Sequence, residues 1–226
     1  MKIKIAPSLL SADFSNLGQA VRQAAEAGAD CLHFDIMDGH FVPNITFGPM
    51  IVRAVRHITD VPFHTHLMIS NPDDYIDEFV SAGSDLISVH VETCPNLFRT
   101  VQCIRSLGAR AAVAVNPATS ISTIEEIVAE VDGILLMTVD PGFGAQEFIE
   151  STLDKIRRTR AMLQKKRLDI DIAVDGGVNE STVGRIVEAG ANLLVAGNSV
   201  FANTVGAAKA VARLRAVAEA AAASGT

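Results

Sequence analysis

The chain contains few cysteines, and their spacing limits the kind of protein it can be. Its 226 residues include only Cys31, Cys94 and Cys103, with no C-x-x-C pair and no even-numbered set. A disulfide framework is therefore not indicated, and all three are expected to be reduced thiols in ordinary packing or surface positions. This cysteine usage favours a soluble, cytoplasmic protein.

Long apolar runs and an excess of positive charge are also missing. No run approaches the roughly 20 apolar residues of a membrane span, and the opening "MKIKIAPSLL" is too short, and too soon interrupted by proline, for a signal peptide. The formal net charge is −7 and the pI is near 5.3. We therefore expect neither a nucleic-acid nor a membrane partner. A small anionic substrate stays compatible, because backbone amides and a bound metal supply local positive potential.

Short apolar runs rich in branched residues recur along the chain and predict eight buried strands. Each is apolar throughout rather than alternating, which is typical of a parallel sheet covered on both faces. The predicted strands are residues 4–10, 31–37, 62–69, 86–92, 110–116, 133–139, 171–177 and 193–199.

Longer segments with helical spacing separate these runs. Residues 17–28, 71–83 and 179–190 place apolar side chains three and four apart, open near an Asn, Asp or Ser suited to capping, and close at a glycine suited to the left-handed end of a helix. The related strings "EAGAD", "SAGSD" and "EAGAN" each lead directly into a predicted strand, so the repeating unit is strand then helix.

Eight such units predict one (β/α)₈ barrel domain over residues 1–226. An open doubly wound sheet is the competing architecture, but no G-x-G-x-x-G follows the first strand to support it. The low-complexity end, from about residue 218 to residue 226, is expected to be a frayed tail.

Polar residues are concentrated where the predicted strands end, the edge at which barrel enzymes carry their reactive groups. His33 and Asp35 share one face of a strand because they are two residues apart, as do His64 and His66. With Asp175 from the seventh strand, His33, Asp35 and His66 form a nitrogen and oxygen ligand set suited to one divalent cation. Zn, Mn, Fe and Co all remain open as its identity.

Two other histidines and three methionines fall in the same layer. His64 and His90, taken singly, are better interpreted as structural residues, since the sequence identifies no partner for either. Met37, Met68 and Met137 lie at the ends of strands two, three and six. They are equally well explained as flexible core filler and as an apolar wall beside a small ligand.

Glycine-rich segments follow the last three predicted strands: "DPGFGAQ" at 140–146, "DGG" at 175–177 and "AGNS" at 196–199. Backbone amides that a ligand can approach closely, together with the start of a short helix, suit a phosphate dianion. The loops after strands seven and eight are the usual place for one in a barrel. We therefore predict a phosphorylated substrate.

The lysines exclude two kinds of barrel chemistry. None lies at the carboxyl end of a predicted strand, which disfavours a Schiff-base aldolase and a sugar-phosphate decarboxylase built on a lysine between aspartates. The lysines are Lys2, Lys4, Lys155, Lys165, Lys166 and Lys209. No nicotinamide or P-loop fingerprint is present either.

Asp35 and Asp175 stand on opposite sides of the predicted barrel mouth. Two carboxylates so placed, with a cation between them, suit removal of a proton next to a carbonyl from one face and its return to the other. The product is an epimer. A base on one side only would give exchange without inversion, or an aldose–ketose isomerisation.

Several longer motifs are spread over essentially the whole chain: "APSLLSADF" at 6–14, "HFDIMDGHFVPN" at 33–44, "HLMI" at 66–69, "MTVDPGFGAQ" at 137–146, "VDGGV" at 174–178 and "AGNSVF" at 196–201. In this order they resemble the ribulose-phosphate 3-epimerase family. The resemblance implies a (β/α)₈ barrel that interconverts D-ribulose 5-phosphate and D-xylulose 5-phosphate with a divalent metal. It leaves a homo-oligomer open.

The resemblance also implies roles for individual residues. Asp35 matches the family's proton acceptor and Asp175 its proton donor, and both belong to the family's metal ligands with His33 and His66. The matching substrate and phosphate positions are Ser8, His66, Gly142, Phe143, Gly144, Ala145, Gly176, Gly177, Gly197 and Asn198.

Three positions depart from the family pattern. A glycine is usual at Ala145, a serine at Asn198 and an aspartate at His64. The first two leave open a 3-epimerase of a longer ketose phosphate, such as D-allulose 6-phosphate, because pocket shape sets the length of the sugar. A non-catalytic sugar-phosphate binding barrel is a further alternative. It would need the phosphate loops but not both aspartates.

Overall fold

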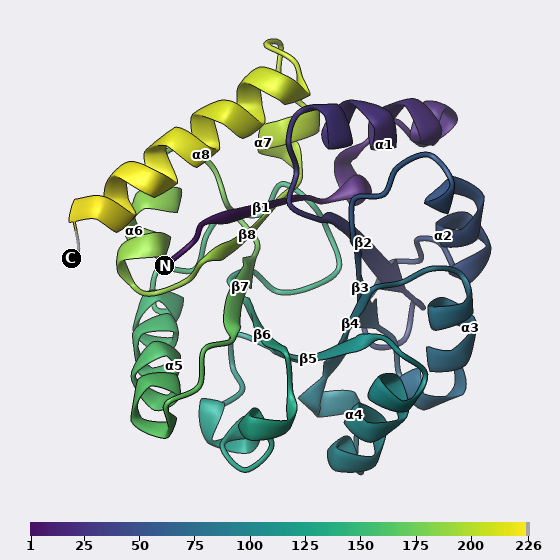
Figure 1. Cartoon of the computed structure of the whole chain (residues 1–226), viewed down its shortest axis with the longest axis vertical. Helices are drawn as coiled ribbons and strands as arrows, with labels where there is room; N and C mark the ends of the chain where they lie inside the picture. The colour runs from purple at the N-terminus through teal and green to yellow at the C-terminus, as the bar shows by residue number, and fades with distance from the viewer. Residues whose placement is uncertain (225–226) are drawn as a thin grey trace.

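The computed structural model describes residues 1–224 and shows one parallel eight-stranded sheet curled into a barrel (Figure 1). The strands are β1 (Lys4–Pro7), β2 (Leu32–Met37), β3 (Phe63–Met68), β4 (Leu86–His90), β5 (Arg110–Val115), β6 (Gly133–Met137), β7 (Asp171–Asp175) and β8 (Leu193–Ala196). From β2 to β8 each strand pairs with the next, and β1 pairs with β8. An isolated parallel bridge between Ser8, just after β1, and His33 closes the barrel between β1 and β2. The predicted barrel is confirmed.

Helices form a ring around the strands (Figure 1). They are α1 (Leu17–Glu26), α2 (Pro49–Arg56), α3 (Ile76–Ser81), α4 (Leu97–Ser106), α5 (Thr152–Lys166), α6 (Val183–Glu188), α7 (Asn198–Phe201) and α8 (Ala207–Ser224). Between β5 and β6 the connection consists of the 3-10 turns η5 (Ile121–Ile124) and η6 (Val128–Glu130). Four more 3-10 turns lie in other loops: η1 (Leu9–Ser11), η2 (Phe14–Asn16), η3 (Pro72–Asp74) and η4 (Val91–Thr93). No helix in residues 1–224 combines the length and apolar character needed to cross a membrane.

The three predicted helices end as expected but begin differently. Gly28, Gly83 and Gly190 have φ of +83°, +104° and +112°, so each takes the left-handed conformation after its helix. The residues directly before α1, α3 and α6 make no side-chain cap bond, and α3 starts only after η3. Asn179, which opens the third predicted segment, does accept from Ser181 N at 2.8 Å, but α6 starts only at Val183. Where we predicted a frayed tail from residue 218, α8 continues to Ser224, and residues 225–226 lie outside the described part of the chain.

Strand alternation decides which residues reach the barrel interior. On β2, Leu32, Phe34 and Ile36 pack outward into the large core shared with the helices. Asp35 and Met37 alternate with them and line a cavity at the barrel mouth. The polar residues of this strand, His33 and Asp35, are therefore on its inward face.

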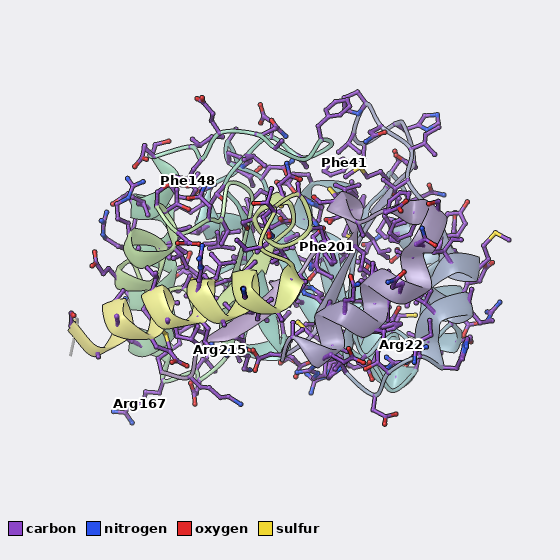
Figure 2. All side chains as sticks on the ribbon, turned by 90° about the horizontal axis from the view of Figure 1, so that it is seen from above. Arg22, Phe41, Phe148, Arg167, Phe201 and Arg215 are labelled. Carbon is purple, nitrogen blue, oxygen red and sulfur yellow. The ribbon has the colours of Figure 1, made fainter. Side chains whose placement is uncertain are left out.

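Loops that follow strands and loops that precede them lie at opposite ends of the barrel. Figure 2 shows Phe41, after β2, and Phe148, after β6, at one end, while Arg167, before β7, lies at the other. The loops after β2 and β6 thus lie at the same end of the barrel, the end at which the candidate site is found.

Candidate active site

A cavity of about 450 Å³ opens at the carboxyl ends of the strands. Most of the residues predicted for the site line it, and they come from β1, β2, β3, β6, β7, β8 and the loops that follow. The predicted residues on its wall are Ser8, Asp35, Met37, Met68, Met137, Gly142, Phe143, Gly144, Ala145, Asp175, Gly176, Gly177, Gly197 and Asn198. His33 and His66 lie beneath this wall, with no exposed surface.

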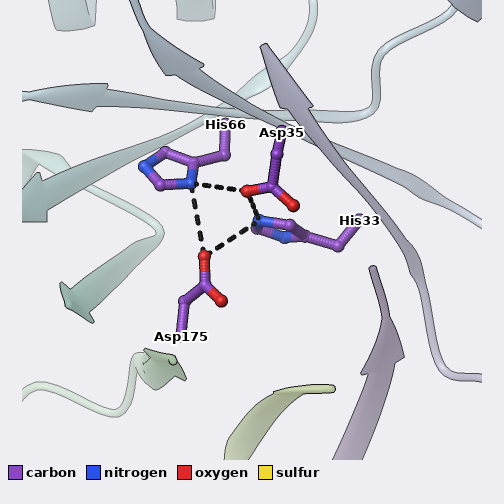
Figure 3. Close-up of side chains that lie close together, drawn as sticks. All are labelled: His33, Asp35, His66 and Asp175. Atoms are coloured by element: carbon purple, nitrogen blue, oxygen red, sulfur yellow. Dashed lines mark hydrogen bonds and ion pairs between the residues drawn. The ribbon is translucent and has the colours of Figure 1, made fainter. Parts of the chain in front are cut away.

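At the floor of the cavity two imidazoles and two carboxylates converge (Figure 3). Asp35 Oδ1 lies 3.2 Å from both His33 Nε2 and His66 Nδ1. Asp175 Oδ2 lies 3.6 Å from His33 Nε2 and 3.5 Å from His66 Nδ1. One ligand atom from each residue falls within 4.8 Å of the other three.

These distances fit a shared cation. A tetrahedral ion bound at the usual 2.0–2.1 Å separates its ligand atoms by about 3.3–3.4 Å, close to the four measured edges. The buried His33 Nε2 has no hydrogen-bond partner within residues 1–224, although Asp35 Oδ1 is near. A lone pair aimed at the centre of the cluster, not at another donor, is what a metal ligand requires. The cluster can therefore hold a metal ion.

The electrostatics show how strongly the four groups interact. Burial opposes ionisation of Asp35, but the adjacent His33 and His66 imidazoles outweigh burial and hold the pKa of Asp35 well below its usual range. Burial likewise lowers the pKa of His66, yet hydrogen bonds to Asp175 and Asp35 raise it to about 9. Asp35 is therefore ionised at neutral pH, the form that accepts a proton.

Ser8 and Thr46 fix Asp35 in place. Ser8 Oγ donates to Asp35 Oδ2 at 2.5 Å. Thr46 Oγ1 donates to the Asp35 carbonyl at 2.6 Å and accepts from Met37 N at 3.0 Å, which fastens the loop after β2 to the end of that strand. Asp35 is thus held through both its side chain and its backbone, and within residues 1–224 its carboxylate pairs with no basic side chain except the two imidazoles.

The glycine-rich loops form a further part of the cavity wall. Gly176 has φ of +118°, and a Cβ there would lie 2.5 Å from Val139 Cγ2 and 2.9 Å from its backbone nitrogen. Ala145 has φ of +60°, so it also occupies the left-handed region that favours glycine. The loop backbone of "DPGFGAQ" therefore keeps a glycine-like conformation despite the alanine.

Replacing Gly176 with alanine is expected to destabilise the fold more than the same change at Gly206. Gly206 also has a positive φ, +86°, but a Cβ there meets nothing within 4 Å, so it reports the backbone cost alone. Overpacking adds about 1–3 kcal/mol. Free energies of unfolding from urea titrations should show this excess for Gly176→Ala, and equal losses for the two variants would contradict the close packing under Gly176.

Ser11 and three residues behind the cluster were not predicted for the site. Ser11 lines the cavity, and its Oγ lies 2.5 Å from where a Gly197 Cβ would be. His64 and His90 contact the two metal-facing imidazoles from behind, and Glu92 contacts His90. The serine repeated in "PSLLS" was the only sequence signal for Ser11.

Asp38 and Lys155 have structural contacts and lie off the cavity wall. Asp38 accepts from the amides of His40, Phe41 and Ser70, which lower its pKa to about 2 although burial opposes this. Lys155 Nζ reaches the end of β5, where it donates to three backbone carbonyls at 2.7 Å. Its amine is thus fully engaged away from the cavity.

Carboxylates and imidazoles converge at the carboxyl ends of eight parallel strands, which is the arrangement of a barrel enzyme. Residues 4–201 match the model of the ribulose-phosphate 3 epimerase family. The chain therefore belongs to this family of isomerases, and the predicted resemblance is confirmed.

Curated relatives agree with the family model over nearly the whole chain. The ribulose-phosphate 3-epimerase of Bacillus subtilis is 54% identical over 88% of this chain and 92% of its own length. The Synechocystis protein of the same name is 48% identical over 94% and 93%. That of Escherichia coli is 44% identical over 87% and 88%.

Solved structures of low sequence identity share the fold. A 3-hexulose-6-phosphate synthase superposes with a TM-score of 0.68 at 19% identity, covering 96% of this chain and 99% of that one. KGPDC from Streptococcus mutans gives 0.71 at 12% identity, covering 97% and 99%. These similarities support the barrel architecture.

Proposed function

We propose that this chain is a metal-dependent 3-epimerase that interconverts D-ribulose 5-phosphate and D-xylulose 5-phosphate. Its membership of the family and the names of its relatives support the reaction. The observation that carries the mechanism is the pair Asp35 and Asp175, which come from β2 and β7 and approach the same two imidazoles from different sides (Figure 3).

In this mechanism the two carboxylates act on opposite faces of one carbon. Asp35, ionised and held by Ser8, takes the proton from C3 of ribulose 5-phosphate. Asp175 then gives a proton to the other face of C3, which inverts its configuration. In the reverse direction the two residues exchange roles.

His33, Asp35, His66 and Asp175 would hold the metal ion. When bound, the cation supplies positive charge that stabilises oxygens becoming negative as the proton leaves C3. Buried His33 and His66 keep their ligand nitrogens directed at the centre from below the cavity floor. We propose no single metal, because this ligand set suits Zn, Mn, Fe and Co.

We propose that the phosphate group of the substrate lies against the three glycine-rich loops. Gly142 to Ala145, Gly176 with Gly177, and Gly197 with Asn198 line the end of the cavity next to Asp175. Met37, Met68 and Met137 line the wall between the carboxylates as an apolar side for the sugar. Apolar side chains beside the carboxylates lower the local dielectric constant, which strengthens the electrostatic interactions of the reacting groups.

The proposal also covers the cellular location of the protein and the alternative of a non-catalytic role. The cysteines Cys31, Cys94 and Cys103 are free thiols, which supports a cytoplasmic location. A non-catalytic binding barrel is disfavoured because both aspartates lie on the cavity wall beside the ligand cluster.

A parallel assay tests the choice of substrate. We expect kcat/KM for D-ribulose 5-phosphate to exceed that for D-allulose 6-phosphate by at least about tenfold, since each lost or strained contact in a fitted pocket changes the barrier by about 1–3 kcal/mol. A higher kcat/KM for the hexulose phosphate would replace the pentulose assignment and leave the epimerase chemistry in place.

A further inference from the structure

A chain of hydrogen-bonded side chains runs from the back of His66 through buried His90 to the half-buried Glu92. His66 Nε2 lies 2.9 Å from His90 Nε2, and His90 Nδ1 lies 3.1 Å from Glu92 Oε2. The other carboxylate oxygen of Glu92 accepts from Asn116 N at 2.9 Å. Both imidazoles have no exposed surface, so no bulk water interrupts the chain.

Counting protons along this chain leaves one arrangement. Ionised Glu92 only accepts hydrogen bonds, so His90 must carry its hydrogen on Nδ1 and donate it. Neutral His90 then has a lone pair on Nε2, which must accept from His66 Nε2. His66 therefore carries a hydrogen on Nε2, and once a metal ion displaces the proton from Nδ1, the Nδ1 lone pair faces the ion between Asp35 and Asp175.

The charges of the two outer groups agree with this assignment. A metal ion on His66 Nδ1 leaves the hydrogen of that ring on Nε2, so His90 Nε2 must accept it and the His90 ring is neutral. Burial opposes ionisation of Glu92, but hydrogen bonds from His90, Thr119 and Asn116 lower its pKa to about 2. A carboxylate and a neutral ring are the species that the proton count requires.

The equivalent chain behind His33 ends differently. His33 Nδ1 lies 3.2 Å from His64 Nδ1, and His64 Nε2 lies 2.6 Å from Ser88 Oγ. A hydroxyl both donates and accepts, so Ser88 is compatible with either direction of this chain. Of these two hydrogen-bond chains, only the one that ends in Glu92 has a single possible direction of donation.

We propose that Glu92, acting through His90, is a positioning residue that fixes the tautomer of His66 and keeps its Nδ1 lone pair directed at the metal centre. This inference rests on the proposed metal site and extends it to residues outside the cavity. Hydrogen bonds to the far nitrogen of a ligand histidine fix its ring and raise its basicity, and their loss typically weakens metal binding by about 10- to 100-fold.

Glu92→Gln tests the proposal because glutamine cannot satisfy both neighbours in the same way. Its carbonyl can accept from Asn116 N, but its NH₂ then faces His90 and must donate to Nδ1. That moves the His90 hydrogen to Nε2. We expect ¹⁵N NMR of the metal-free protein to show His90 protonated at Nδ1 when residue 92 is glutamate, and at Nε2 in Glu92→Gln.

The second measurement is the affinity for Co²⁺, determined from the visible absorption of the bound ion. We expect Kd to rise about 10- to 100-fold in Glu92→Gln, and to stay closer to the unaltered value in Glu92→Asp, which keeps a group that only accepts. Should Glu92→Gln not fold, the ¹⁵N spectrum of the unaltered, metal-free protein still reports the His90 tautomer, and the Nε2 form would overturn the proposal.

Lys155→Met is the matched control. Lys155 holds the same loop after β5 through the carbonyls of Asn116, Pro117 and Thr119, but it contacts neither histidine. If Lys155→Met reproduces the loss of Co²⁺ affinity, Glu92 acts only by holding the loop and the proposal is overturned. An unchanged His90 tautomer in Glu92→Gln overturns it as well.

The two readouts separate this inference from the proposed function. If the unaltered chain binds no Co²⁺, the metal part of the proposed function fails. The tautomer of His90 is measured without metal, and the Nδ1 form would still support the positioning role of Glu92, whereas the Nε2 form would refute it.

Discussion

Replacing Asp175 with asparagine is expected to lower kcat/KM for epimerisation by about 10²- to 10⁴-fold, the usual contribution of a positioned general acid. Asparagine keeps the shape of the side chain but has no proton to give to C3. Asp35 remains able to take a proton from the opposite face, so exchange of the C3 hydrogen of ribulose 5-phosphate should persist after inversion is lost. Rates in both directions, with circular dichroism to verify the fold, measure the effect.

Asp171→Asn is the control for this change. Asp171 lies at the other end of the same strand, β7, where it pairs with Lys4 at 2.6 Å far from the cavity. Its replacement should leave epimerisation near the unaltered rate. Because Asp175 is also a proposed ligand, the metal content of Asp175→Asn is measured alongside. Near-normal turnover in Asp175→Asn would remove this residue from the mechanism.

Removing the metal is expected to have an effect of similar size. A bound cation typically contributes several kcal/mol to stabilising charge in the transition state, so prolonged chelation should lower kcat by about 100-fold or more. Adding back Zn²⁺, Mn²⁺, Fe²⁺ or Co²⁺ separately should restore activity to different extents and identify the best cofactor.

The control for metal removal is a measurement of whether the fold survives chelation. The four ligand residues lie inside a barrel whose core is built from other side chains, so far-ultraviolet circular dichroism should not change on chelation. Full activity in a sample shown by elemental analysis to hold no metal would refute metal dependence.

Most of the fold could be predicted from the sequence because each strand is a self-contained apolar run. All eight predicted strands are present, although several end earlier than predicted. The last, predicted to residue 199, ends at Ala196 because Gly197 already turns the chain into α7. Helix starts were predicted poorly: Pro72 begins the turn η3, so α3 starts at Ile76.

The convergence of His33, Asp35, His66 and Asp175 could be predicted because spacing by two fixes the face of a strand and strand order fixes the end of the barrel. The contacts between side chains of neighbouring strands could not be predicted. His33 and His64 are register partners on β2 and β3, and His90 reaches His66 from β4. Register depends on how the whole sheet closes, so His64 and His90 looked like isolated structural residues.

Solvent deuterium incorporation tests the two-carboxylate mechanism most directly. D-ribulose 5-phosphate is incubated with the enzyme in D₂O, and the xylulose 5-phosphate formed in the first turnovers is analysed by NMR and mass spectrometry. Proton removal by Asp35 and return by Asp175 predict deuterium from the solvent at C3 of the inverted product. An epimer that retains its original C3 hydrogen would contradict the mechanism.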